Sequence, residues 1–258
     1  MPRPSSTSRE RARPRLVAMK LVVALAGLSV AAASTIKRVG VVIAPGFELL
    51  DALGPYETLK EVEEGYYTQI DIANRTWGTP TGIACADGEL NVTAALVAFF
   101  GGAAAPVVPS SSGVGIAPEF DLASDASATH FDLLVVPAGA STDATDDYVR
   151  RHHAAGGLVV SVCTGASVPA KLGLLDGSTA TSNSLFLDGF RAEYPAVNWV
   201  SLADDLDTRF IRSTPQITTC AGITAGIDGA LHQIGEWCGH DVAEATRQCL
   251  EWPLALEA

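Results

Sequence analysis

Apolar residues occur along this chain in short unbroken runs, and most of the runs lead into stretches with helical spacing. Continuous apolar, β-branched runs predict strands that are buried on both faces of a sheet. The three clearest runs cover residues 39–43, 131–136 and 157–162. Residues 66–73 alternate between apolar and polar and predict a further strand, and residues 178–182 predict a short one.

Helical spacing follows most of these strands. The predicted helices cover residues 48–64, 146–155, 165–175 and 185–194. A longer helix follows, in which one apolar stripe at a spacing of 3 to 4 residues comprises Ile223, Ile227, Leu231, Ile234 and Cys238. Gly239 ends that helix, and a short final helix follows it. Residues 197–211 predict a hairpin around Asp204 and Asp205.

Strands that alternate with helices predict one parallel sheet covered on both faces. We therefore expect an α/β fold: a single doubly wound, flavodoxin-like domain over residues 36–252. In such a sheet ligands bind beyond the carboxyl ends of the strands.

Residues 77–115 interrupt this alternation of strands and helices. The segment is rich in Gly, Ala, Ser, Thr and Pro, and its apolar stretch at 94–100 has no clear period. A structureless connection of this length is unusual inside a compact domain. We interpret it as a long insertion. The insertion is a functional lid, a disordered segment or retained non-coding sequence, and these three alternatives stay open.

The N-terminal 33 residues form a separate unit of sequence. A basic stretch precedes an apolar run from Leu21 to Ala33, which ends in small residues before Ser34. This order is typical of a secretory signal peptide, and the alternatives are a transit peptide, an anchor or an ordinary extension. Met19 is an alternative start. We expect a secreted or extracytoplasmic protein if the segment is functional, and a cytoplasmic one otherwise.

Charge and cysteine spacing exclude several function classes. The 258-residue chain has a net charge of −12 and no Lys/Arg cluster after its N-terminal segment, so nucleic acid is not an expected partner. No later apolar run approaches the ~20 residues of a membrane span. The five cysteines, together with the histidines, match no zinc-binding spacing, so no metal is expected.

Cys163 stands at the corner between a buried strand and a helix. The sequence Val162-Cys163-Thr164-Gly165 has the layout of a nucleophile elbow, although the Gly-x-Ser-x-Gly spelling is absent. A helix N-terminus at this corner is expected to lower the pKa of the thiol. The alternative is an inert cysteine packed in the core.

Asp51 follows the first strand and lies between Leu50, Leu53 and Pro55. A carboxyl group in apolar surroundings has a raised pKa and can hold or transfer a proton. The alternative is that Asp51 only caps the turn that follows it.

Five motifs taken together resemble the ThiJ/PfpI superfamily over residues 37–238, with the exception of the 77–115 segment. They are Leu50-Asp51-x-x-Gly54-Pro55-x-Glu57, Leu134-Val-Val-Pro137-x-Gly139, Val162-Cys163-Thr164-Gly165, Leu174-Leu175-Asp176-Gly177-x-x-Ala180-Thr181 and Ala221-Gly222-Ile223-Thr224-Ala225-Gly226-Ile227-Asp228. Asp in the first loop with Cys-Thr at the elbow is similar to the isonitrile hydratase branch.

This resemblance implies a hydro-lyase without a cofactor that adds water to an isonitrile and forms an N-substituted formamide. It implies that Cys163 is the nucleophile or its close partner, that Asp51 is the proton donor and later the base, and that Thr164 orients or donates a proton. Backbone N–H groups of Gly139, Ala140 and Thr164 are expected to form an anion-stabilising pocket. The expected substrate pocket also includes Gly165 and Asn183. A homodimer is expected because dimers are common in the superfamily.

Two positions depart from the superfamily pattern. Ala138 replaces the first Gly of a Gly-Gly pair, and residues 182–184 read Ser-Asn-Ser instead of Thr-His-Trp or Thr-Asn-Lys. Because that second loop is expected to line the pocket, the departure leaves the substrate itself open.

Two further function classes compete with the hydratase hypothesis. One is a ligand-sensing module, since similar domains form the sensory half of some transcription regulators. The other is a thiol protein that handles carbonyl adducts or senses oxidation through Cys163. Under export, Cys85, Cys220, Cys238 and Cys249 can pair in three ways and leave Cys163 free.

Overall fold

A sheet with strand order β12-β13-β9-β8-β1-β4-β7 forms the centre of the fold in the computed structural model of the chain. The structure describes residues 35–63, 70–71, 76–77, 85, 90–99, 106–123, 131–202 and 209–253. The strands of this sheet are β1 (Thr35–Val42), β4 (Leu90–Ala98), β7 (Phe120–Asp121), β8 (Leu133–Val136), β9 (Leu158–Val162), β12 (Phe210–Arg212) and β13 (Ile217–Cys220). Neighbouring strands are parallel, except that β12 is antiparallel to β13.

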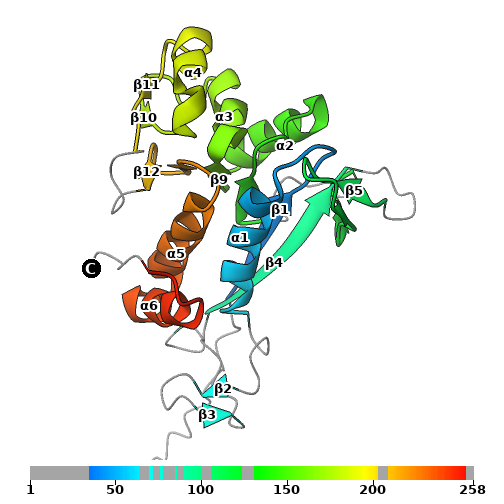
Figure 1. Ribbon diagram of the computed structural model, residues 1–258, viewed down its shortest axis with the longest axis vertical. Helices are drawn as coiled ribbons and strands as arrows, with labels where there is room; N and C mark the ends of the chain where they lie inside the picture. The colour runs from blue at the N-terminus through cyan, green and yellow to red at the C-terminus, as the bar shows by residue number, and fades with distance from the viewer. Residues whose placement is uncertain are drawn as a thin grey trace, which may run out of the picture. The chain divides into compact units, whose positions relative to one another are not determined.

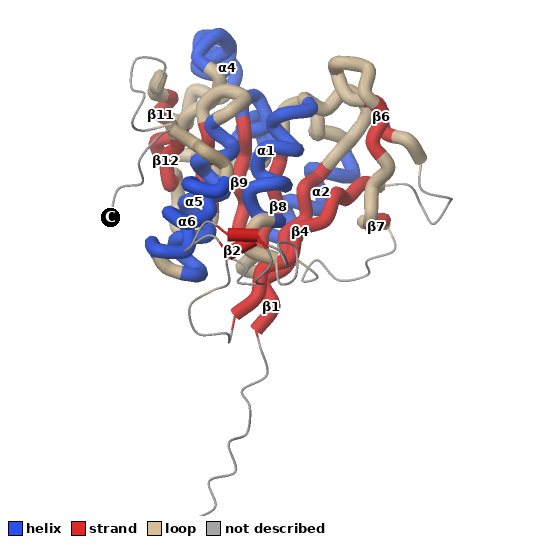
Figure 2. The backbone as a smooth tube through the Cα atoms, turned by 60° about the horizontal axis from the view of Figure 1, so that its bottom comes forward, coloured by secondary structure: helices blue, strands red, loops and turns tan. Residues whose placement is uncertain are grey.

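Helices cover both faces of the sheet (Figures 1 and 2). On one face lie α1 (Leu49–Lys60), α5 (Ala225–Cys238) and α6 (His240–Cys249), and on the other lie α2 (Asp143–Ala154), α3 (Ser167–Lys171) and α4 (Leu187–Glu193). The prediction of a doubly wound, flavodoxin-like α/β fold is therefore confirmed.

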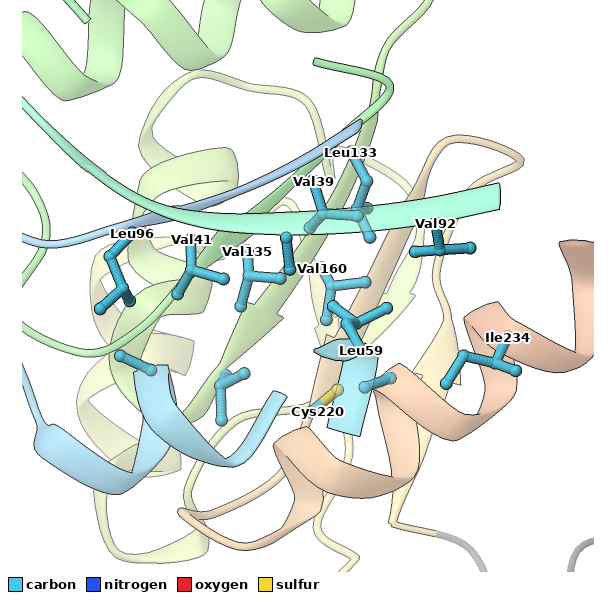
Figure 3. Close-up of a cluster of buried hydrophobic side chains, with 14 of the residues drawn as sticks. Val39, Val41, Leu59, Val92, Leu96, Leu133, Val135, Val160, Cys220 and Ile234 are labelled. Atoms are coloured by element: carbon cyan, nitrogen blue, oxygen red, sulfur yellow. The ribbon is translucent and has the colours of Figure 1, made fainter. Parts of the chain in front are cut away.

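The central strands bury side chains on both faces because each face is covered by helices. In β1, Val39 and Val41 belong to the core under α1 and α5, while Val42 belongs to the core under α2 to α4. Figure 3 shows side chains of the first core, among them Val39, Val41, Leu59, Val92, Leu96, Leu133, Val135, Val160, Cys220 and Ile234. These residues form the apolar layer that fixes the strand ends in place.

Part of the segment interpreted as an insertion is an integral strand. Residues 90–98 form β4, which pairs in parallel with β1 over residues 90–97. The interpretation of 77–115 as an insertion is therefore wrong for this part. The stretch lacks a period because small and apolar residues occupy both faces of a buried strand. Further along, β5 (Val108–Pro109) and β6 (Gly115–Ile116) pair with each other.

The chain between 197 and 211 does not form the predicted hairpin. Instead, β11 (Asn198–Trp199) pairs in parallel with β10 (Thr179–Ala180), while β12 pairs with β13. Extended backbone is present at both ends of this stretch, but β11 and β12 pair with β10 and β13 rather than with each other. The strand prediction over 66–73 coincides with described structure only at β2 (Ile70–Asp71), which pairs with β3 (Thr76–Trp77) outside the main sheet.

The predicted targeting segment, residues 1–33, lies outside the described residues. Among the helices that the structure describes, none combines the length and the apolar character needed to cross a membrane.

Candidate active site

The carboxyl ends of β1, β8 and β9 lie side by side because these strands are neighbours in the sheet. The first end leads through a short loop into α1, which carries Asp51. The second leads into Pro137 and Ala138, and the third into Cys163. Three loops that are distant in sequence therefore converge where ligands bind in parallel sheets.

Cys163 adopts a left-handed backbone conformation, with φ of 57°, which side chains other than Gly rarely accept. It begins a four-residue 3₁₀ helix, η1 (Cys163–Ala166), which runs directly into α3. The Ser182 hydroxyl donates a hydrogen bond of 2.7 Å to the Cys163 carbonyl oxygen and helps to hold this conformation. A strained strand-to-helix corner of this kind matches the layout of a nucleophile elbow.

Three hydrogen-bond donors face the Cys163 sulfur. They are the backbone N–H of Thr164, the side-chain amide of Asn183 and the backbone N–H of Ile223, and each lowers the pKa of the thiol. Burial and the nearby charge of Asp51 nevertheless raise this pKa above its usual value. The expectation of a lowered thiol pKa is therefore wrong: the adjoining helices are short, and desolvation outweighs the donors.

Asp51 is fully buried, and its carboxyl group accepts a hydrogen bond from the backbone of the β8 loop. Its Oδ2 accepts the N–H of Ala138 at 3.0 Å, and its Oδ1 has no hydrogen-bond partner in the part of the chain that the structure describes. Burial, opposed in part by that bond, raises the pKa of Asp51 from 3.8 to about 7. The carboxylate of Glu48 raises it further, and interaction with the Cys163 thiol lowers it.

The capping alternative for Asp51 does not fit this geometry. Glu48 is the N-cap of α1, and its carboxylate accepts the backbone N–H of Asp51 at 2.6 Å. The Asp51 side chain instead points to Ala138 and Cys163. Glu48 is half-buried and acts electrostatically on Asp51.

Asp51 and Cys163 therefore form a pair in which the charge of Asp51 raises the pKa of the thiol, while a hydrogen bond with the thiol lowers the pKa of the Asp51 carboxyl group. Two neighbouring negative charges would repel each other. After one of the two groups has lost its proton, the other therefore keeps its own, and the pair holds one proton. A shared proton next to a sulfur nucleophile is suited to adding a proton and a nucleophile to the same carbon atom.

The structure gives structural roles to three of the predicted pocket residues: close packing at Gly139 and Gly165, and a backbone hydrogen bond at Ala140. A Cβ on Gly139 (φ of +75°) would overlap the Gly46 carbonyl oxygen, and one on Gly165 would overlap the Val136 carbonyl oxygen. The N–H of Ala140 donates to the Pro137 carbonyl oxygen at 3.3 Å, so it is not free to bind an anion. The anion-stabilising set expected from Gly139, Ala140 and Thr164 is thus corrected at Ala140.

The backbone N–H of Thr164 and the side-chain amide of Asn183 lie beside the thiol, and the proton-transfer role of the Thr164 hydroxyl stays a prediction. Asn183 also accepts the N–H of Leu185 at 3.1 Å and so begins the 3₁₀ helix η2 (Ser184–Phe186). The sequence did not single out the N–H of Ile223 or the hydroxyl of Ser182. Ile223 lies within one of the quoted motifs and Ser182 directly follows another, but only the fold brings them to Cys163.

None of the three arrangements that pair all four remaining cysteines is realised in full, because one disulfide forms and two of these thiols stay free. Cys85 and Cys238 form a disulfide, and Cys163, Cys220 and Cys249 are free. Cys220 is fully buried and lies against Gly229, in agreement with a packing role. No cluster of three or more potential metal ligands occurs among the residues with described positions.

The model of a family described as the DJ-1/PfpI family matches residues 37–231. Over 127 residues the chain is 34% identical to an isonitrile hydratase of Pseudomonas putida, and this match covers 47% of the chain and 52% of that protein. The chain thus matches only about half the length of this curated relative.

Solved structures show the same fold at low identity. The chain is similar to DJ-1beta of Drosophila melanogaster, with a TM-score of 0.62 and 20% identity over 86% of this chain and 100% of that one. It is also similar to a ThiJ/PfpI family protein from Pseudomonas syringae, with a TM-score of 0.60 and 20% identity over 87% of this chain and 78% of that one.

Proposed function

The chain belongs to the DJ-1/PfpI family, and on that premise we propose that it is a hydro-lyase that adds water to an isonitrile and releases an N-substituted formamide. The observation that carries this proposal is the buried Asp51–Cys163 pair, which combines a proton held near neutral pH with a sulfur nucleophile. The partial identity to an isonitrile hydratase supports the substrate class.

In the first step, the Cys163 sulfur bonds to the terminal carbon of the isonitrile. The thiol proton passes through Asp51 to the same carbon, which gives a neutral thioimidate, R–N=CH–S–Cys. The pair supports this transfer because Asp51, with a pKa of about 7, can take a proton and release it again at neutral pH. The donors on Thr164, Asn183 and Ile223 stabilise negative charge on sulfur during the step.

In the second step, Asp51 acts as the base for water. The carboxylate takes one water proton while the hydroxide bonds to the thioimidate carbon, and the nitrogen receives the hydroxyl proton as the C–S bond breaks. Thr164 is the nearest hydroxyl-bearing residue along the chain to relay that proton. The products are R–NH–CHO and the thiolate, to which Asp51 returns its proton, so that the pair is regenerated.

Apolar side chains on the two turns that flank the thiol fit an apolar substituent on the isonitrile nitrogen. Leu185, 87% exposed, and Phe186 follow Asn183, and Ile223 provides one of the backbone donors. An uncharged, apolar reactant is also consistent with the two carboxyl groups, Glu48 and Asp51, beside the sulfur, because they repel anions.

A redox-sensing role is less well supported by the same geometry. Sensor thiols are exposed and have low pKa values, whereas Cys163 is 5% exposed and its pKa is raised. Homodimerisation, which the family resemblance implies, is part of the proposal and is measured by light scattering of the same preparation.

The deciding experiment follows formamide formation from cyclohexyl isocyanide by the purified chain, with Cys163→Ala and Asp51→Asn as variants. We expect wild type to turn over and both variants to lose at least ~100-fold in kcat, the scale of nucleophilic and acid–base catalysis. Cys249→Ser is the matched control, since this thiol contacts Glu61 away from the site. An inert wild type whose Cys163 still reacts with iodoacetamide would overturn the hydratase proposal in favour of a thiol-handling or ligand-sensing role.

A further inference from the structure

A largely buried ion pair connects the segment before β12 with the first turn of α5. Arg209 Nη1 lies 3.0 Å from Asp228 Oδ2, and the two side chains are 17% and 8% exposed. Asp228 belongs to the last family motif, but the proposed reaction does not use it. An ion pair at this depth is costly to desolvate, so its presence calls for a specific role.

The C-terminal segment completes this cluster. Trp252 Nε1 donates a hydrogen bond of 2.8 Å to Asp228 Oδ1, and the Arg209 guanidinium lies 5.4 Å from the centroid of the Trp252 ring. Arg247 of α6 also donates to the Trp252 carbonyl oxygen. Asp228 is thereby held between a cation and an indole N–H, and we call Arg209, Asp228 and Trp252 the clamp.

The clamp is bonded to the turn that faces the catalytic sulfur. The Arg209 carbonyl oxygen accepts the N–H of Ala221 at 2.9 Å, and its guanidinium donates to the Thr224 hydroxyl. Between these two attachment points lies Ile223, whose backbone N–H faces the Cys163 sulfur. Both ends of the turn are therefore fixed by one arginine, which is itself fixed by Asp228 and Trp252.

We propose that the clamp is a positioning device that holds the Ile223 N–H against the Cys163 sulfur and so sets the reactivity of that thiol. Arg209, Asp228 and Trp252 touch no reacting atom and act through the turn. The inference deepens the proposed function, on which its catalytic meaning rests, but the reactivity of the thiol can be measured without any isonitrile.

A substitution in the clamp can act on the Cys163 thiol in two ways, by moving the Ile223 N–H or directly through the change in charge, and the two ways have opposite effects. The group that acts on Cys163 through its charge is Asp51 of α1, whereas the charges of Asp228 and Arg209 act on Cys220 of β13. Asp228→Asn removes a negative charge and leaves Arg209 unpaired. Through the field alone, this change would lower the pKa of Cys163 and speed its alkylation. Loss of the Ile223 donor would do the opposite.

The test measures the rate of Cys163 alkylation by iodoacetamide as a function of pH in the full chain, with mass spectrometry to assign the modified residue. For Asp228→Asn we expect the profile to move to higher pH and the rate at pH 8 to fall about tenfold, the scale of one lost hydrogen bond to a charged group. Trp252→Phe, which changes no charge and keeps an aromatic ring but removes the N–H to Asp228, is expected to give a smaller change in the same direction.

Glu236→Gln is the matched control, because Glu236 pairs with Arg212 at 3.0 Å across the same two elements, α5 and β12, but is half exposed. Its profile should equal that of wild type. An unchanged or faster Asp228→Asn would overturn the proposal, and if that variant does not fold, an unchanged profile for Trp252→Phe would overturn it. A shifted profile in a chain that does not turn over isonitriles would uphold the clamp and refute only the proposed reaction.

Discussion

At the scale of single residues, the site depends on two residues held in unfavourable states, one through its backbone conformation and the other through burial of its carboxyl group. Cys163 has a left-handed backbone at a cost of about 1–3 kcal/mol, and Asp51 is a carboxyl group with no solvent exposure. The surrounding structure supports both, through Ser182 at the Cys163 carbonyl and Ala138 at the Asp51 carboxyl. Strain retained in this way is typical of a functional site.

The raised pKa of Asp51 predicts how stability depends on pH. Below about pH 4 the carboxyl is protonated in both the folded and the unfolded chain. Between there and about pH 7 the unfolded chain loses this proton first, so the folded state is progressively destabilised as the pH rises and the loss levels off above pH 7. Asp51→Asn, which stays neutral, should lack this component.

Denaturant unfolding of wild type and Asp51→Asn at intervals from pH 4 to pH 8 measures the difference. We expect the free energy of unfolding of wild type to fall relative to the variant across this window. Parallel curves would show that Asp51 ionises at its ordinary pKa in the folded chain.

At the scale of elements, the site depends on the close approach of the elbow to β8. Gly165 lies in η1, and a Cβ there would overlap the Val136 carbonyl oxygen and crowd the Pro137 backbone. Backbone atoms cannot move aside as the end of a long side chain can. The glycine is therefore required for packing between two adjacent strand ends rather than for binding a substrate.

Gly165→Ala is expected to destabilise the chain by ~1–3 kcal/mol, the cost of overpacking, and to slow Cys163 alkylation because η1 must shift. Thermal unfolding and the alkylation rate are the two measurements. Gly189→Ala in α4 is the matched control, since nothing lies near its Cβ position, and it should be neutral or stabilising by up to ~1 kcal/mol. Equal behaviour of the two variants would contradict the close-approach argument.

At the scale of the whole molecule, one covalent link joins segments that are far apart in sequence. The disulfide between Cys85 and Cys238 spans 153 positions and ties the 77–115 segment to the end of α5. Disulfides persist in oxidising compartments, so this bond supports the proposal that the N-terminal segment directs export.

Loss of this disulfide should destabilise the folded chain by ~2–5 kcal/mol, chiefly because the unfolded chain gains freedom. Unfolding with and without reductant, and of Cys85→Ser, measures the effect, and Cys249→Ser should behave as wild type because its thiol is free. An unfolding midpoint that reductant leaves unchanged would contradict a stabilising role for the bond.

The sequence by itself determined the fold class and the two central residues of the site. Unbroken apolar runs can be buried only between two layers of helices, and parallel strands bring their carboxyl ends to one edge. Cys163 and Asp51 each follow such a run, so their proximity could be predicted from order along the chain. The strand β4 was missed because small residues on both faces leave no period, and β13 because it is short and rich in Thr.

Only the tertiary structure decided the electrostatics and the supporting contacts. Whether the pKa of Cys163 falls or rises depends on the balance between three donors and the burial of the thiol, and that balance has no local signature in the sequence. The Ile223 donor comes from a turn 60 positions away from Cys163 in the numbering of the chain. Long-range packing places such groups, so their roles follow from the assembled sheet rather than from any stretch of sequence.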